Sequence, residues 1–134
     1  MKVVGLNGKT YVLGLSGESN VLNKSKYHLI AREVIKKVFS SIKLSEEVHI
    51  PGCPSTMYMD FFIPLMKIGI EVQGEQHYKM VPHFHKDKMA FALARKRDRE
   101  KAEWCEINGI SLIEFPYNET PEQWEERLRN VYRS

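Results

Sequence analysis

Residues 60–77, which read DFFIPLMKIGIEVQGEQH, decide how this 134-residue chain is expected to fold. Two short apolar runs, YMDFFI and KIGIEV, flank residues 64–66, and this pattern predicts two antiparallel strands joined by a tight turn. A turn centred between positions 65 and 66 places Asp60 directly opposite Glu71. The stretch therefore brings two carboxylates together inside an otherwise apolar hairpin.

Side-chain alternation divides this hairpin into two faces. Asp60, Glu71 and Gln73 are predicted to share one face with Phe62. Like charges directly opposite each other destabilise a bare sheet, so a cation is expected between the two acids. The other, apolar face is predicted to hold Met59, Phe61, Ile63, Ile68, Ile70 and Val72.

Helices are predicted on both sides of the hairpin in the sequence. Ser25 is suited to cap a helix over residues 25–39, in which apolar residues recur at four-residue spacing. A second, long helix is expected over about residues 84–108, with Gly109 as its stop.

Further short elements complete the expected sheet and its cover. Residues 46–50 and 110–115 are strand candidates, because both are short and rich in apolar and β-branched residues. A last helix is predicted from Thr120 to near Tyr132, with Thr120 and Gln123 as a capping box.

The order of these elements predicts an α/β fold, with a mixed β-sheet flanked by helices. The segment VVGLNGKTYVL adds a small N-terminal β-hairpin around Asn7 and Gly8, a dipeptide that type I′ turns favour. The length is that of one domain. We expect a hairpin and loop over 1–24, a catalytic core over 25–116 and a C-terminal helix over 117–134.

Composition sets broad limits on function. The net charge of +3 is only mildly basic and does not by itself indicate a nucleic-acid partner. No apolar run approaches the roughly 20 residues that span a bilayer, and the N-terminus lacks the features of a secretion signal. We therefore expect a soluble, cytoplasmic protein that binds no membrane, with Cys53 and Cys105 as reduced thiols.

Two carboxylates at this spacing are suited to Mg²⁺, which proteins bind through one or two carboxylates while it keeps waters for substrate phosphates. In phosphodiester hydrolysis such an ion polarises the phosphoryl oxygen and activates a water. Asp60 and Glu71 are therefore the predicted metal ligands, and Mn²⁺ is expected to replace Mg²⁺. His77 is the candidate general acid or base, because imidazole titrates near neutral pH.

The spacing of Asp60, Glu71 and Gln73 resembles the PD-(D/E)xK nuclease core. In that superfamily an acidic residue and a (D/E)xK tripeptide lie on adjacent strands and bind the divalent metal. Gln73 stands where the lysine of the tripeptide usually is. The resemblance implies a restriction-endonuclease-like core and a metal-dependent endonuclease, in which Gln73 positions water or the metal.

The segments IEVQGEQHYK and RDREKAEWCEINGISLIEF are similar to one branch of that superfamily. It contains the very-short-patch mismatch repair endonuclease and phage or intron-encoded homing endonucleases, with a site written EDxHD. The likeness implies a site made of Glu33, Asp60, His77 and Asp98, in which His28 could take the place of Glu33. It also implies a phage or mobile-element nuclease that acts in the cytoplasm of a host cell.

The segment ARKRDREK holds five basic residues among eight. Alone, such a run is usually a solvated helix face. Beside acids that would repel DNA, it provides phosphate contacts, so double-stranded DNA is the predicted partner. A homodimer would suit double-strand cutting. The predicted DNA-binding residues are Lys79, Lys86, Lys88, Arg95, Arg97, Arg99 and Lys101.

Other interpretations stay open at this point. The chain could be a catalytically inert DNA-binding or protein-binding module on a nuclease fold, because Gln73 lacks an ammonium group. It could equally be a structure-specific nuclease for branched or mismatched DNA. His77, His83 and His85 could indicate zinc, although no well-spaced fourth ligand accompanies them. Asp98 could simply pair with neighbouring basic side chains on the surface.

Overall fold

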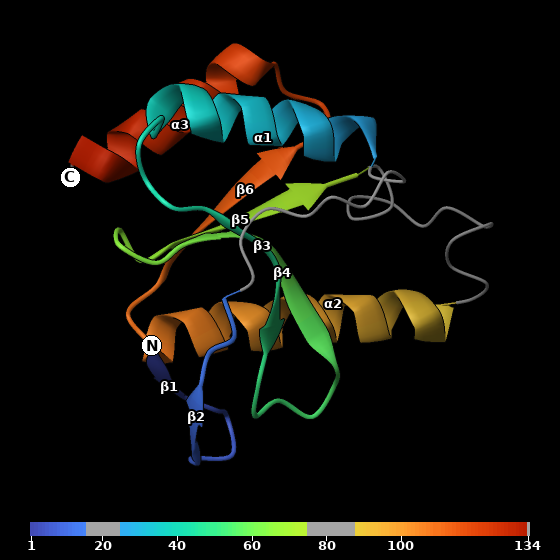
Figure 1. Ribbon diagram of the computed structural model, residues 1–134. Helices are drawn as coiled ribbons and strands as arrows, with labels where there is room; N and C mark the ends of the chain where they lie inside the picture. The colour runs from blue at the N-terminus through green and yellow to red at the C-terminus, as the bar shows by residue number, and fades with distance from the viewer. Residues whose placement is uncertain (16–24, 75–87, 134) are drawn as a thin grey trace.

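A four-stranded mixed sheet forms the centre of the molecule, and the computed structural model describes residues 1–15, 25–74 and 88–133 (Figure 1). The sheet has the strand order β3-β4-β5-β6, and a separate antiparallel hairpin is formed by β1 and β2. The elements are β1 (Lys2–Val4), β2 (Thr10–Val12), α1 (Lys26–Val38), β3 (Ser45–Ile50), β4 (Met57–Ile63), β5 (Ile68–Gln73), α2 (Lys88–Ile107), β6 (Ser111–Pro116) and α3 (Pro121–Arg133). The predicted α/β class, with a mixed sheet, flanking helices and an N-terminal hairpin, is confirmed.

The register of β4 against β5 is the one that the sequence predicts. The two strands are antiparallel, with Phe61 opposite Ile70 and Ile63 opposite Ile68, as a turn centred between positions 65 and 66 requires. Strand β3 pairs antiparallel with β4, whereas β6 pairs parallel with β5. Parallel neighbours need a crossover connection, and here that connection carries α2.

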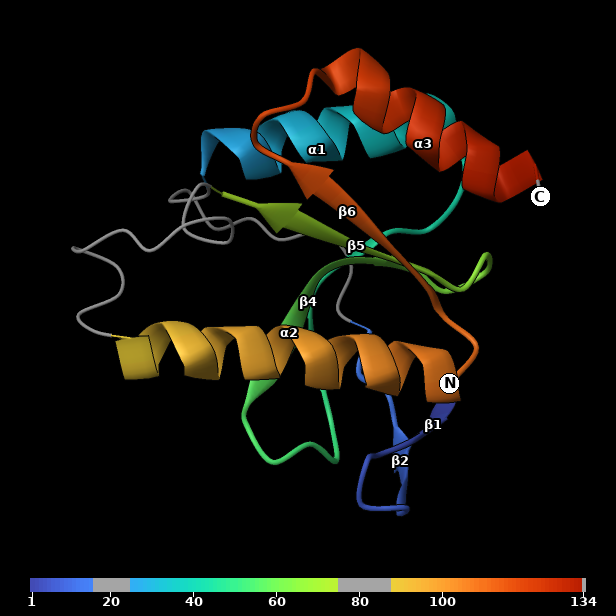
Figure 2. The same ribbon diagram turned by 180° about the vertical axis from the view of Figure 1, so that it is seen from behind.

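The sheet is covered on both faces. Helices α1 and α3 lie together on one face, and α2 lies on the other, as Figures 1 and 2 show from opposite sides. The first apolar core, beneath α1 and α3, contains Phe61, Ile70 and Trp124. The second core, beneath α2, contains Phe62 and Trp104. Both cores therefore include side chains from the middle of β4, with Phe61 in the first and Phe62 in the second.

The alternation of β4 changes at Asp60. Sequence alternation places Met59 on the face of Phe61, but Met59 packs in the second core with Phe62, while Phe61 packs in the first. The predicted position of Met59 is therefore wrong. On the neighbouring strand, Glu47 has a φ of 52°, a left-handed conformation that interrupts the regular pleat. Glu47 and Asp60 are absent from the ladder between β3 and β4, so Asp60 lies at the point where the alternation changes.

The predicted caps of α1 and α3 and the predicted stop after α2 are confirmed, whereas the predicted start of the second helix near residue 84 lies outside the described residues. Ser25 caps α1 by accepting a hydrogen bond from the His28 N–H at 3.1 Å. Thr120 and Gln123 form the predicted capping box of α3, with reciprocal hydrogen bonds of 2.8 and 3.2 Å. Gly109, with a φ of 67°, follows α2 as its stop. None of the helices in the described ranges is long and apolar enough to cross a membrane.

The N-terminal hairpin forms, but its turn differs from the prediction. Gly5 N–H donates to Lys9 O at 2.9 Å and Gly8 N–H donates to Gly5 O at 3.0 Å. Gly8 has a positive φ of 80°, whereas Asn7 does not have a positive φ. The predicted type I′ turn is therefore wrong, and a longer loop replaces it. Its physical reason is the Asn7 side chain, which accepts the Lys9 N–H at 3.0 Å.

Candidate functional site

Asp60 and Glu71 lie side by side where β4 and β5 separate. The Asp60 N–H donates to Glu71 Oε2 at 2.9 Å, and the Val72 N–H donates to Asp60 Oδ2 at 2.9 Å. Each carboxylate thus accepts a main-chain N–H from the other strand, next to the last ladder pair of Phe61 and Ile70. This exchange fixes both acidic side chains between the two strands.

Lys101 supplies a positive charge to this pair from α2. Its Nζ forms an ion pair with Glu71 Oε1 and donates to the Tyr58 backbone oxygen at 2.7 Å. The Lys101 and Glu71 side chains are only 14% and 12% exposed. Lys101 therefore supplies, from within the chain, a positive charge next to the acidic pair, where the sequence predicts a cation.

The charge on Glu71 is held in an unfavourable environment. Burial, followed by the nearby charge of Asp60, raises the pKa of Glu71 to about 7, although Lys101 acts in the opposite direction. The pKa of Cys105, which lies on α2 one turn after Lys101, is raised to about 12, mainly by burial and then by Glu71. Cys53 and Cys105 are both free. Glu71 can therefore take up or release a proton near neutral pH, and Cys105 stays a neutral thiol.

The remaining predicted residues of the hairpin lie at the end of β5. Gln73 is 9% exposed and is two residues after Glu71, which places both side chains on the same side of the strand. Its backbone oxygen accepts the Tyr117 N–H at 2.8 Å, which ties this end of β5 to the segment after β6. His77, the predicted acid or base, lies outside the described residues, as do His83 and His85.

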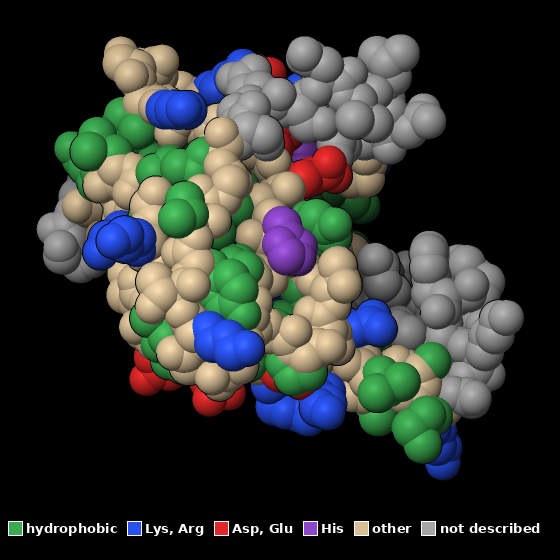
Figure 3. Space-filling model, turned by 60° about the horizontal axis from the view of Figure 1, so that its bottom comes forward, with side chains coloured by type: hydrophobic (Ala, Val, Ile, Leu, Met, Phe, Trp, Pro, Cys, Tyr) green, Lys and Arg blue, Asp and Glu red, His purple; other side chains and the backbone are tan. Residues whose placement is uncertain are grey.

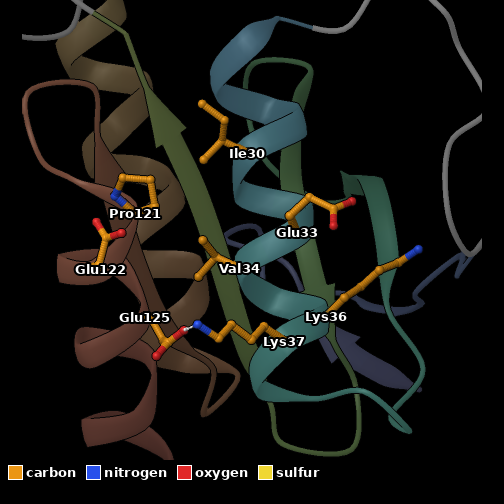
Figure 4. A pocket seen from close by; sticks show the side chains of 8 residues that line it. All are labelled: Ile30, Glu33, Val34, Lys36, Lys37, Pro121, Glu122 and Glu125. Carbon is orange, nitrogen blue, oxygen red and sulfur yellow. Dashed lines mark ion pairs between the residues drawn. The ribbon is translucent and has the colours of Figure 1, made fainter.

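Asp98 and Glu33 lie in different places relative to the carboxylate pair. Asp98 is half-buried and one helical turn before Lys101, so it lies on the side of α2 that faces the pair. Glu33 is exposed on α1, which covers the opposite face of the sheet. Figure 4 shows the Glu33 carboxylate pointing away from α3, beside a surface pocket of about 510 Å³. Asp98 thus shares one side of α2 with Lys101, whereas Glu33 lies on the other face of the sheet.

The predicted DNA-binding residues of α2 do not share one face. Lys88, Arg95, Arg97 and Arg99 are exposed, whereas Lys101 belongs to the acidic site. Arg97 lies four residues before Lys101, on the same side of the helix, while Arg95 and Arg99 lie on the opposite side. Figure 3 shows Lys and Arg side chains spread over its view of the surface rather than gathered in one patch. Lys79 and Lys86 lie outside the described residues.

Sequence reasoning missed a second buried acid, Glu46 on β3. Its Oε1 lies 2.6 Å from His28 Nε2, and its two oxygens accept from Arg32 Nη2 and Nε at 2.9 and 3.0 Å. The His28 ring stacks on Phe61 at 4.4 Å. One signal could have revealed part of this network: the four-residue spacing of His28 and Arg32, which puts both side chains on one face of α1. Strand alternation could not, because the face on which Glu46 lies depends on the left-handed conformation of Glu47.

Sequence reasoning also missed the role of Lys101, which it assigned to DNA contact. Lys101 lies three and four residues before Trp104 and Cys105, which are 0% and 1% exposed. Residues at these spacings lie on one helix face. The inward position of Lys101 could therefore have been recognised from the two buried residues that follow it.

The carboxylate pair fits Mg²⁺ in number and kind of ligand. No cluster of three or more His, Cys, Asp or Glu side chains suited to a metal occurs within the described part of the chain. Mg²⁺ needs fewer, because it is commonly held by one or two carboxylates with waters and substrate phosphates. Asp60 and Glu71 provide two carboxylates fixed by main-chain hydrogen bonds. A metal bound there would share Glu71 with Lys101.

Several viral proteins are similar to this chain in sequence. "Uncharacterized protein 307L" of Invertebrate iridescent virus 6 is 48% identical over 59 residues, which cover 44% of this chain. "Uncharacterized protein 033L" of Invertebrate iridescent virus 3 is 38% identical over 67 residues, or 50% of this chain. "Uncharacterized protein 094L" of Frog virus 3 (isolate Goorha) is 34% identical over 102 residues, or 75% of this chain.

The chain spans only part of these relatives. The matched regions make up 30%, 34% and 64% of the lengths of the three viral proteins, in the same order. No protein-family model matches the chain. No solved structure matches it either.

Proposed function

We propose that this chain is a Mg²⁺-dependent endonuclease that hydrolyses phosphodiester bonds in double-stranded DNA. One observation carries the proposal: Asp60 and Glu71 are fixed side by side through each other's strands, with Lys101 bonded to Glu71. The resemblance to PD-(D/E)xK nucleases supports the same assignment. Because the relatives are viral proteins, we place the proposed activity in a viral or mobile-element context, in the cytoplasm of the host cell.

The side chains of the site have distinct proposed roles. Asp60 and Glu71 would hold Mg²⁺, which when bound supplies charge neutralisation and an activated water. The main-chain N–H groups of Asp60 and Val72 hold the two carboxylates in place. Lys101, bonded to Glu71, would add positive charge to the site, which favours a transition state richer in negative charge.

Neighbouring residues would complete the reaction and bind its substrate. Gln73, with its amide group on the side of Glu71, would orient water or the metal. His77 would transfer a proton. Asp98, on the same side of α2 as Lys101, would complete the outer shell of the metal site. Arg97 is the exposed basic residue of α2 best placed to contact a DNA phosphate at this site.

The test is metal-dependent nicking of supercoiled plasmid by purified protein. The informative variants are Asp60→Asn and Glu71→Gln, because each keeps a side-chain oxygen to accept the main-chain N–H while it removes the negative charge. We expect wild-type protein to nick plasmid in Mg²⁺ or Mn²⁺, and each variant to lose at least roughly a hundredfold in rate, the scale of one lost electrostatic group. Glu126→Gln, on the exposed side of α3, is the matched control and should cleave at the wild-type rate.

Two outcomes would change the proposal. Wild-type protein that binds DNA but never nicks it, in either metal, would favour the inert binding module. That alternative has its own support, because Lys101 already occupies one oxygen of Glu71. Faster cleavage of branched or mismatched duplexes than of linear duplex would instead indicate a structure-specific nuclease.

A further inference from the structure

We propose that Lys101 is the built-in counter-ion of the carboxylate pair and that it competes with the divalent metal for Glu71. The identity of the metal rests on the proposed function, whereas the competition itself is a property of the site and can be measured without DNA. The inference gives Lys101 a positioning role in the acidic site, in place of the surface DNA contact that the sequence suggested.

The bonding of Glu71 supports this competition. Its Oε2 accepts the Asp60 N–H, and its Oε1 is bonded to Lys101 Nζ. Both carboxylate oxygens are therefore engaged before any metal arrives. A divalent ion that uses Glu71 must displace the ammonium group from Oε1 or bind close beside it, where two positive charges repel each other.

The helix around Lys101 allows the side chain to move while its backbone stays fixed. Trp104 and Cys105, one turn further along α2, are 0% and 1% exposed and anchor the helix in the second core. The lysine side chain is a flexible four-carbon stem. Its second contact, with the Tyr58 backbone oxygen at 2.7 Å, offers an acceptor that does not belong to the acidic pair. The ammonium can thus leave Glu71 without a change in the fold.

This arrangement explains how a site with Gln73 instead of a lysine can be balanced in charge. Asp60 and Glu71 together carry two negative charges in a largely buried place, and Lys101 offsets one of them in the absence of metal. A divalent metal would offset both negative charges, and the ammonium group of Lys101 would then be available to a phosphate oxygen. Lys101 therefore links the metal-free and metal-bound forms of the same site.

The experiment compares Mn²⁺ affinity by isothermal titration calorimetry at about pH 8.5, without DNA, for wild-type protein and three variants. Lys101→Met removes the ammonium and keeps much of the stem, Lys101→Arg keeps a positive charge, and Lys43→Met makes the same change at an exposed loop position. We expect Lys101→Met to bind Mn²⁺ at least about tenfold more tightly than wild type. Lys101→Arg and Lys43→Met should stay within about threefold of wild type. Thermal unfolding confirms that each variant is folded.

An Mn²⁺ affinity that is unchanged or weaker in Lys101→Met would overturn the competition, as would a failure of both wild type and Lys101→Met to bind Mn²⁺. The result is separable from the proposed function. Tighter Mn²⁺ binding by Lys101→Met, with no nicking by wild type, would remove the nuclease proposal and leave the role of Lys101 standing. Plasmid nicking by wild type, together with an unchanged Mn²⁺ affinity in Lys101→Met, would support the nuclease proposal and remove the proposed role of Lys101.

Discussion

Two buried glutamates on the same sheet have opposite surroundings. Glu46, on β3, is 1% exposed. Its carboxylate accepts hydrogen bonds from Arg32 Nε and Nη2, and its Oε1 lies 2.6 Å from His28 Nε2. Glu71, on β5, has another carboxylate, Asp60, as a close neighbour and one ammonium as its positive partner. The negative charge of Glu46 is compensated by His28 and Arg32, whereas Asp60 places a second negative charge next to Glu71.

The difference teaches that burial of an acid does not by itself indicate chemistry. The Glu46 network fixes α1 to β3 with its charge compensated, which is the arrangement of a structural ion pair. In contrast, burial and the charge of Asp60 raise the pKa of Glu71 to about 7. Glu46 is therefore compensated by its own neighbours, and Glu71 is the acid for which we propose a divalent ion.

The sharpest way to break this comparison is Glu46→Gln. The substitution removes the negative charge that Arg32 Nη2 and Nε contact, and the Arg32 side chain is only 18% exposed. Loss of one partner of a buried ion pair costs about 3 kcal/mol, so we expect the free energy of unfolding in urea to fall by about that amount. The Mn²⁺ affinity of the folded protein should not change, because Glu46 contacts α1 on the opposite face of the sheet. A variant as stable as wild type would show that Glu46 is not the structural acid.

The second test uses the pH dependence of stability. The folded-state pKa of Glu71, about 7, lies above its ordinary value of 4.5, so the native state holds this proton more tightly than the unfolded chain. The stability that Glu71 contributes is therefore complete below pH 4.5 and is lost as the pH rises through about 7. Glu71→Gln has no such titration. Its unfolding free energy, relative to wild type, should improve by about 3 kcal/mol between pH 4.5 and 8.

Chemical denaturation of both proteins across this pH range provides the measurement. Glu126→Gln serves as control, since Glu126 is exposed on α3, and its difference from wild type should stay constant with pH. If the difference in unfolding free energy between Glu71→Gln and wild type is also constant with pH, the charge of Glu71 is compensated as fully as that of Glu46.

The smallest expected effect comes from the cap of α1. Ser25 accepts the His28 N–H at 3.1 Å, and it therefore stabilises the helical turn from which His28 reaches Glu46. Ser25→Ala should lower the free energy of unfolding by about 1 kcal/mol. In the Glu46→Gln background the loss should be smaller, because His28 no longer contacts a carboxylate. Equal losses in the two backgrounds would separate the helix cap from the Glu46 network.

Much of the fold follows from local patterns in the sequence. The caps at Ser25 and Thr120, and the stop at Gly109, are set by neighbouring residues, and all three are found as predicted. The pairing of β4 with β5 follows from a turn of fixed length. The position of Met59 does not follow, because it depends on the left-handed conformation of Glu47 on another strand.

The candidate site was predictable only in part, for the same reason. The proximity of Asp60 and Glu71 is a property of one hairpin, so the sequence indicates it directly. Trp104 and Cys105 indicate that Lys101 points inward, but its contact with Glu71 depends on how α2 packs across the sheet, which no local pattern specifies. The exposed position of Glu33 likewise reflects the packing of α1, because the inward polar positions of that helix are taken by His28 and Arg32.

The parallel pairing of β5 with β6 has a consequence for the order in which the site is assembled. The hairpin of β4 and β5 closes through contacts that are near in sequence, so Asp60 and Glu71 can meet as soon as it forms. Lys101 lies within the crossover and reaches Glu71 only when α2 has packed and β6 has joined the sheet. The two acids thus come together before the residue that offsets one of their charges has packed against them.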